Sequence, residues 1–130
     1  MFTKSVALVV ALLLTSPLAA HHSLVGYENR NLVKVTGTVT RVDWFNPHVM
    51  VYLAVRGNDG KVTTQHVQMA AVGALKKRGI DKNPFAVGST VLFEVWAPKD
   101  PNYVFAGRNA QLPDGTRLDV SDNWERMSPR

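Results

Sequence analysis

Hydrophobic and polar residues alternate with a period of two along most of the chain from residue 33 onward, which is the pattern of half-buried β-strands. The clearest case is the segment 48–56 (HVMVYLAVR), in which Val49, Val51 and Leu53 share one face. Turn residues at 57–60 (GNDG) then favour a hairpin. The same alternation, bounded by turn residues, predicts strands at 33–44, 48–56, 61–69, 90–97, 103–111 and 116–120.

The first of these strands contains a glycine in its middle. Gly37 predicts a bulge or a sharp coil, as small barrels need where a strand bends from one sheet into another. Simple alternation separates two faces along this strand. One carries Lys34, Thr36, Thr38 and Thr40, and the other carries Val33, Val35, Val39 and Arg41.

One segment, 70–80 (AAVGALKKRGI), has helical spacing. Ala71, Val72 and Leu75 form a short apolar stripe, and Gly79 is placed to end the helix. Three strands, a short helix and further strands follow the element order of an OB-type Greek-key barrel. We therefore predict a mainly β fold, a small five- to six-stranded OB-like barrel with one short helix between strands three and four. A small β-sandwich is the alternative.

The first 20 residues have the organisation of a secretory signal peptide. Lys4 supplies the positive charge, an unbroken apolar run covers 6–14, and small residues follow at 16–20. The run is too short for a transmembrane anchor, which needs roughly 20 apolar residues. We expect cleavage after Ala20, which would leave His21 as the first mature residue of a periplasmic or secreted, soluble protein.

The remaining chain of about 110 residues suits one domain. We expect an N-terminal arm at 21–32, the barrel domain at 33–120 and a polar tail at 121–130. The chain has no cysteine, so it has neither disulfides nor thiolate metal sites. Its formal charge is +5, but the basic residues are scattered, whereas nucleic-acid binders concentrate charge on one face. We expect no nucleic-acid partner.

The predicted mature N-terminus is a candidate copper ligand. A free α-amine beside the His21 imidazole offers two nitrogens, His22 follows, and a third nitrogen from elsewhere would complete a site. Cleavage after Ala19 would instead give Ala20-His21-His22, a set that suits square-planar Cu(II) or Ni(II). The alternative is a frayed tail whose histidines contact only water.

An internal candidate lies in the segment 43–48 (DWFNPH). Pro47 restrains its own backbone and that of Asn46, so the turn aims His48 in a defined direction. If the arm folds back, His21, His22 and His48 would converge in a site suited to copper, and less well to zinc. Asp43 would then accept a hydrogen bond from an imidazole, and Trp44 and Asn46 are further candidate binding residues. Alternatively, His48 caps a backbone carbonyl.

The sequence contains none of the common catalytic motifs: no nucleophile elbow, phosphate-binding loop, dinucleotide fingerprint or metalloprotease helix. This favours a binding protein over an enzyme. The leading hypothesis is a periplasmic binding protein that holds copper. The second is a metal-free interaction module that binds a partner protein or an oligosaccharide through the barrel face. The third is a copper-dependent oxidative enzyme.

Several of these features together resemble a family of small exported bacterial proteins known only as a domain of unknown function. The most specific part is the stretch from Gly37 to His48, read as Gly-x-Val-x-x-Val-x-Trp-x-Asn-Pro-His. The matching residues are His21, His22, Ser23, Gly37, Val39, Val42, Trp44, Asn46, Pro47, His48, Gly79, Gly88, Pro98, Asp114 and Gly115. The third strand departs from the family, which usually shows Trp-x-x-Glu or similar where this chain has 66–69 (HVQM). The resemblance implies export and a compact β fold, and no activity.

Overall fold

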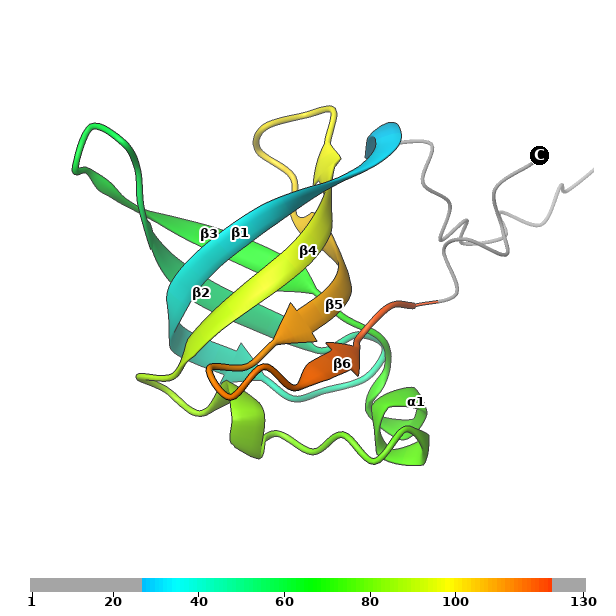
Figure 1. Cartoon of the computed structure of the whole chain (residues 1–130). Helices are drawn as coiled ribbons and strands as arrows, with labels where there is room; N and C mark the ends of the chain where they lie inside the picture. Colours follow the sequence, from blue (N-terminus) through cyan, green and yellow to red (C-terminus); the bar gives the residue numbers. More distant parts are fainter. Residues whose placement is uncertain (1–26, 123–130) are drawn as a thin grey trace, which may run out of the picture.

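The computed structural model describes residues 27–122 (Figure 1). The predicted signal peptide, His21, His22 and most of the predicted tail lie outside the described residues. The elements in chain order are β1 (Tyr27–Asp43), β2 (Met50–Arg56), β3 (Val62–Gln68), α1 (Val72–Lys77), a 3-10 helix (Asn83–Phe85), β4 (Thr90–Pro98), β5 (Phe105–Gln111) and β6 (Arg117–Asp119). The prediction of a mainly β fold with one short helix between strands three and four is confirmed.

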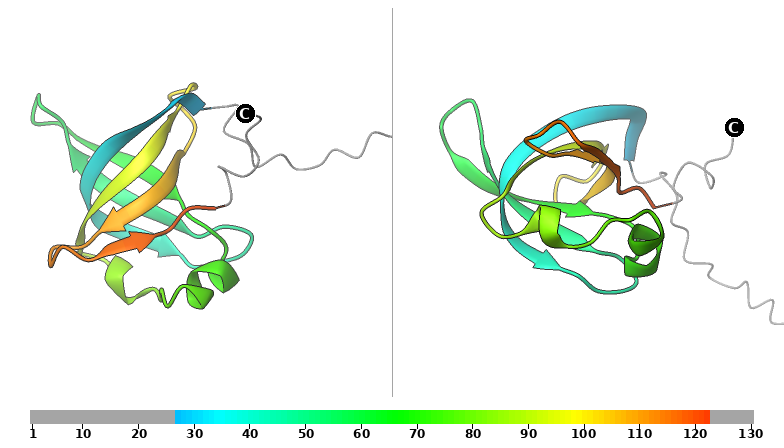
Figure 2. Two further views of the ribbon diagram at one scale, coloured as in Figure 1. Left: turned by 45° about the vertical axis from the view of Figure 1, so that its right-hand side comes forward. Right: turned by 60° about the horizontal axis from the view of Figure 1, so that its bottom comes forward.

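The six strands form one sheet in the order β3-β2-β1-β4-β5-β6, with antiparallel neighbours throughout. β3 and β5 also pair in parallel, through Val67 opposite Phe105 and Gln68 opposite Ala106. The sheet coils so that β1 and β4 face β2 and β3 across the interior (Figures 1 and 2). The two helices lie at one end of the sheet, and the β2–β3 hairpin projects at the other (Figure 2).

The core follows the alternation of the strands. Inward residues of β2 and β4 are fully buried at Val51, Leu53, Val91, Phe93 and Val95. The rings of Phe85 and Phe93 stack with centroids 6.0 Å apart. Val120, just after β6, is also fully buried. The core residues are Val39, Val49, Val51, Leu53, Val67, Met69, Ala70, Leu75, Ile80, Phe85, Val91, Phe93, Val95, Ala110 and Val120. Among residues 27–122, no helix is long and apolar enough to cross a membrane.

Strand β1 is longer than its sequence pattern predicts. It begins at Tyr27 rather than at Val33, because backbone pairing with β4 extends to Tyr27 opposite Pro98. Residues 27–32 show no apolar alternation, so the pattern of side chains does not predict a strand there.

Gly37 lies where β1 passes from one partner strand to the other. β1 pairs with β4 as far as Thr38 and with β2 from Thr38 onward. A Cβ atom on Gly37 would lie 2.7 Å from the carbonyl oxygen of Ala54, so the glycine permits the close approach of β1 and β2. The irregularity predicted at Gly37 occurs slightly later, as a register shift between Val39 and Arg41.

The register shift also changes the face of β1 on which Arg41 lies. Simple alternation groups Arg41 with the valines of β1, but the shift turns Arg41 to the outer face of the sheet, where its guanidinium lies over the ring of Tyr52. Val33 is 41% exposed, so the first valine of the set also lies outside the core.

Helix α1 is shorter than the predicted segment 70–80. Gly79 has a φ of +76°, which ends the helix, and the amide of Ile80 donates to the carbonyl of Leu75. At the other end of the predicted segment, Ala70 is not part of the helix. Its amide donates to the carbonyl of Val120, which follows β6. Buried Leu75 is the residue that fixes the helix on the core.

Candidate functional site

His48 lies immediately before β2 in a well-fixed position. It follows the Asn46–Pro47 peptide bond, which is cis, and precedes Val49, which is fully buried. The amide of Val49 donates to the carbonyl of Ala70, and the carbonyl of Val49 accepts from the amide of Met69. The imidazole itself is 13% exposed. The sequence prediction that the turn holds His48 in a defined direction agrees with this geometry.

The carboxylate beside His48 comes from the far end of the described chain. His48 Nε2 lies 2.8 Å from Asp122 Oδ2, across 74 positions of sequence. Ala70 explains why these segments meet, because its carbonyl accepts from Val49 and its amide donates to Val120. The backbone of one residue therefore joins the start of β2 to the segment after β6.

The paired imidazole and carboxylate have a defined chemistry. A carboxylate accepts hydrogen bonds, so this contact places a proton on Nε2 and fixes the orientation of the ring. The same arrangement orients metal-ligating histidines in proteins, where a carboxylate bound to one ring nitrogen sets the tautomer and raises the basicity of the other. Asp122 is 22% exposed, so the pair lies at the surface of the fold but largely covered.

The other predicted site residues lie elsewhere. Both carboxylate oxygens of Asp43 are engaged, by Arg41 Nε at 2.8 Å and by Tyr52 Oη at 3.0 Å. The structure thus brings Asp122, rather than Asp43, to the ring of His48. Trp44 is half-buried and packs against the core. Asn46 Oδ1 accepts from the amide of Val72 at 3.1 Å, so Asn46 ties the turn to the first residue of α1. The predicted ligands His21 and His22 lie outside the described residues.

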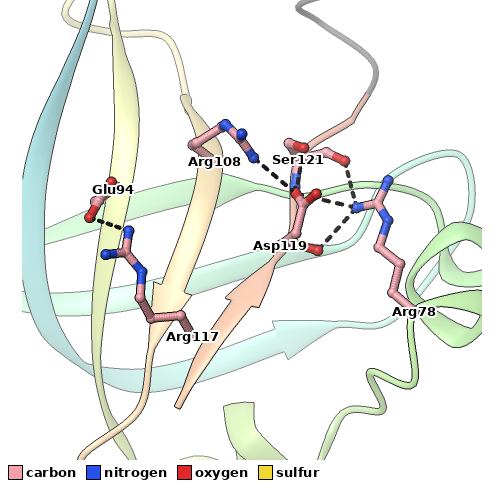
Figure 3. Close-up of polar contacts among 6 residues, drawn as sticks. All are labelled: Arg78, Glu94, Arg108, Arg117, Asp119 and Ser121. Atoms are coloured by element: carbon pink, nitrogen blue, oxygen red, sulfur yellow. Dashed lines mark hydrogen bonds and ion pairs between the residues drawn. The ribbon is translucent and has the colours of Figure 1, made fainter. Parts of the chain in front are cut away.

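A polar cluster around Asp119 fastens the segment that carries Asp122 (Figure 3). Arg78 Nη1 donates to the carbonyl oxygens of Asp119 at 3.0 Å and Ser121 at 2.7 Å. Asp119 Oδ1 accepts from Ser121 Oγ at 2.6 Å and from Arg108 Nη1 at 3.3 Å. Beside the cluster, Arg117 Nη2 pairs with Glu94 Oε1 at 2.7 Å. The segment after β6 is therefore anchored on α1 and β5, although its sequence predicts a polar tail.

These contacts change the titration of Asp119. Partial burial would by itself raise the pKa of its carboxyl group, but the hydrogen bonds from Ser121 and the charges of Arg78 and Arg108 outweigh it and hold the pKa below the ordinary value of 3.8. A depressed folded-state pKa contributes stability above the unfolded-state pKa, and this contribution disappears as pH falls through the folded-state pKa.

We therefore expect Asp119→Asn to lower the free energy of unfolding by about 0.5–1 kcal/mol at neutral pH, a modest effect because the side chain is 52% exposed. The difference between variant and wild type should shrink as pH falls below ~4. Urea unfolding across the acid range measures both quantities. A difference that stays constant down to the lowest pH would contradict the assigned titration.

A second surface feature lies on the outer face of β1, β4 and β5. It is an open groove of about 400 Å³, lined by Thr36, Thr90, Leu92, Gln111, Leu112 and Pro113. None of these side chains is ionisable, so the groove offers shape without a charge that would orient a ligand.

The fold and the site define a small, mainly β protein with an ordered imidazole–carboxylate pair between the segment before β2 and the segment after β6. Within residues 27–122, no group of three or more histidine and carboxylate side chains could hold a metal ion.

Residues 9–105 match the model of a family of unknown function, DUF6152, and the chain belongs to this family. The resemblance to a domain of unknown function is thus confirmed. His48 lies inside the matched residues and Asp122 beyond them. No curated protein and no solved structure matches the chain.

Proposed function

We propose that this protein is an exported binding protein with an OB-like β-barrel, and that it holds copper through His48 together with His21 and His22. The barrel is supported by the strand pairings. Because β5 pairs with β3 as well as with β4 and β6, each of the strands β1 to β5 has at least two neighbours. The helix between β3 and β4 also fits the OB-type element order.

The observation that carries the copper proposal is the contact between His48 Nε2 and Asp122 Oδ2. A histidine on a flexible surface loses entropy when it binds a metal, whereas His48 is already fixed by buried Val49 and by Asp122. An imidazole held by a carboxylate is the usual form of a histidine ligand. Imidazole nitrogen is a ligand that Cu(II) accepts.

The remaining donors would come from the mature N-terminus. The described residues supply one histidine ligand, His48, oriented by Asp122, and the other nitrogens would be those of His21, His22 and the α-amine that cleavage after Ala20 would create. Export is supported by the apolar run at 6–14 and the small residues that follow it. Most ligands of copper in such a site would be nitrogen atoms that the chain itself supplies.

The test is a Cu(II) titration of the mature protein, with its first residue established by intact mass. We expect one tight site with a nitrogen-rich electron paramagnetic resonance spectrum. His48→Ala should weaken it at least about tenfold, and Asp122→Asn by about 10–100-fold, because the carboxylate orients the ring. Asp59→Asn, which removes an exposed carboxylate in the β2–β3 turn, is the matched control and should leave the affinity unchanged.

The outcomes separate the hypotheses. Copper binding that ignores His48→Ala would assign the metal to the N-terminal nitrogens alone. The absence of a tight site in the wild-type protein would overturn the copper proposal and leave the metal-free interaction module, which binds a partner protein or an oligosaccharide. Urea unfolding of both site variants shows whether an affinity change arises from loss of the fold.

A further inference from the structure

The outer face of β1, β2 and β3 carries a polar row that the copper proposal does not use. Arg41 on β1 lies directly opposite Tyr52 on β2, and Tyr52 lies directly opposite His66 on β3. The next row, toward the start of β2, places Asp43 opposite Met50 and Met50 opposite Gln68. Three strands thus bring an arginine, a tyrosine, a histidine and a carboxylate into one small area.

The guanidinium of Arg41 is held from two sides. Its Nε donates to Asp43 Oδ1 at 2.8 Å, and its Cζ lies 5.0 Å from the centroid of the Tyr52 ring. Tyr52 Oη donates to the other oxygen of Asp43 at 3.0 Å, which closes a three-residue cluster. The Arg41 side chain is still 64% exposed, and among the described residues its terminal nitrogens Nη1 and Nη2 have no hydrogen-bond partner. The cluster presents this pair of donors to solvent in a fixed orientation.

His66 flanks the tyrosine ring on the side of β3. Its ring centroid lies 4.5 Å from that of Tyr52, at an interplanar angle of 61°. The imidazole is exposed, and Thr64 and Gln68 lie on the same face of β3, two residues to either side. Hydroxyl, amide and imidazole groups therefore follow one another along the strand beside the arginine.

We infer that this face binds an acidic oligosaccharide, with a uronate carboxylate on the terminal nitrogens of Arg41 and sugar hydroxyls on the polar groups of β3. The planar pair of guanidinium donors matches the geometry of a carboxylate. The adjacent Asp43 disfavours a doubly charged phosphate more strongly than a singly charged carboxylate. The net charge of the chain is positive, +5 for the full sequence including Lys4, and stays positive after removal of residues 1–20, so it attracts a polyanion.

The surroundings of the row favour a sugar over a peptide. The large exposed hydrophobic residues of the described chain are Leu32, Val33, Phe45, Val62, Val87 and Tyr103, and none belongs to these two rows. Peptides bound as strands, helices or polyproline segments place side chains in pockets or apolar grooves, whereas a polyhydroxylated ligand needs hydrogen-bonding groups spread over a face. The site uses neither His48 nor Asp122, so it is independent of the copper proposal.

The experiment is calorimetric titration of the protein with a short oligogalacturonate at low ionic strength, with a chelator present to exclude metal. Arg41→Gln should weaken binding at least about tenfold, since the charged hydrogen bonds are lost. Arg41→Lys keeps the charge but loses the planar pair of donors and should weaken binding as well. Arg56→Gln removes an equal charge from the end of β2, where Arg56 donates to the carbonyl of Gly60, and should leave binding nearly unchanged.

Two comparison ligands define the chemical class. The methyl-esterified oligogalacturonate has the same backbone without charge and should not bind. Binding of oligoglutamate with the same dependence on Arg41 would show that an acidic peptide is the ligand and would overturn the assignment to a sugar. If Arg41→Gln and Arg56→Gln weakened oligogalacturonate binding equally, the ligand would be attracted by the net charge of the protein alone. The absence of oligogalacturonate binding would also overturn the proposal, and unfolding of each variant in urea establishes that the fold is intact.

Discussion

Replacing Phe93 with alanine should lower the free energy of unfolding by about 3–5 kcal/mol. Phe93 is fully buried in the middle of β4, and its ring stacks on that of Phe85 from the 3-10 helix. The truncation removes apolar contacts and leaves a cavity between the sheet and the helical end of the molecule. A small domain has a total stability of only about 5–15 kcal/mol, so the variant should retain little of it.

Equilibrium unfolding in urea or guanidinium measures this loss as a shift in midpoint. Phe45→Ala is the matched control, because Phe45 is 67% exposed and the same truncation there should change stability by less than about 0.5 kcal/mol. Similar losses at the two positions would mean that Phe93 does not occupy the core as described.

Gly37→Ala should destabilise the protein by about 1–3 kcal/mol, the usual cost of forcing extra volume into a packed position. The added Cβ would meet the carbonyl oxygen of Ala54 at 2.7 Å and side-chain atoms of Leu53 and Val55 at 3.0 Å. The nearest atom belongs to backbone. The clash is therefore relieved only if β1 and β2 move apart where their pairing begins, at Thr38 opposite Ala54.

The control for this variant is Gly73→Ala in helix α1. A Cβ on Gly73 meets nothing within 4 Å, and alanine is a better helix former than glycine by about 0.8–1.0 kcal/mol. Gly73→Ala should therefore raise the free energy of unfolding. Glycine to alanine should therefore lower the free energy of unfolding at position 37 and raise it at position 73. Thermal or urea unfolding of both variants measures these two changes. Destabilisation of equal size at both positions would contradict the close approach of β1 and β2.

The elements that the sequence predicts best are those in which side-chain burial and backbone pairing coincide. Val49, just before β2, and Val51 and Leu53 on β2 alternate with outward residues, and all three are buried. The pattern fails at the start of β1, which pairs with β4 from Tyr27 although its sequence shows no apolar alternation there. It also misplaces Arg41, because a register shift changes which face a residue occupies.

Half of the imidazole–carboxylate pair could be predicted from sequence. The Asn-Pro-His segment identifies His48 as a histidine with a defined direction, and the structure agrees. Asp122 could not be predicted, because it lies 74 positions away in a polar segment with no local signal. Its position depends on the bond between Ala70 and Val120, which is a property of the tertiary fold. The row of Arg41, Tyr52 and His66 likewise depends on the register of three strands.

The placement of Val120 has a consequence for the order of events during biosynthesis. Val120 is fully buried, its carbonyl accepts from the amide of Ala70, and its amide donates to the carbonyl of Arg108. A nascent chain grows from its N-terminus, so all six strands are synthesised before this residue exists. The core then lacks a buried side chain, and the amide of Ala70 lacks its acceptor. The native state therefore becomes accessible only when the segment after β6 has been synthesised, and a chain exported as we propose would remain unfolded until then.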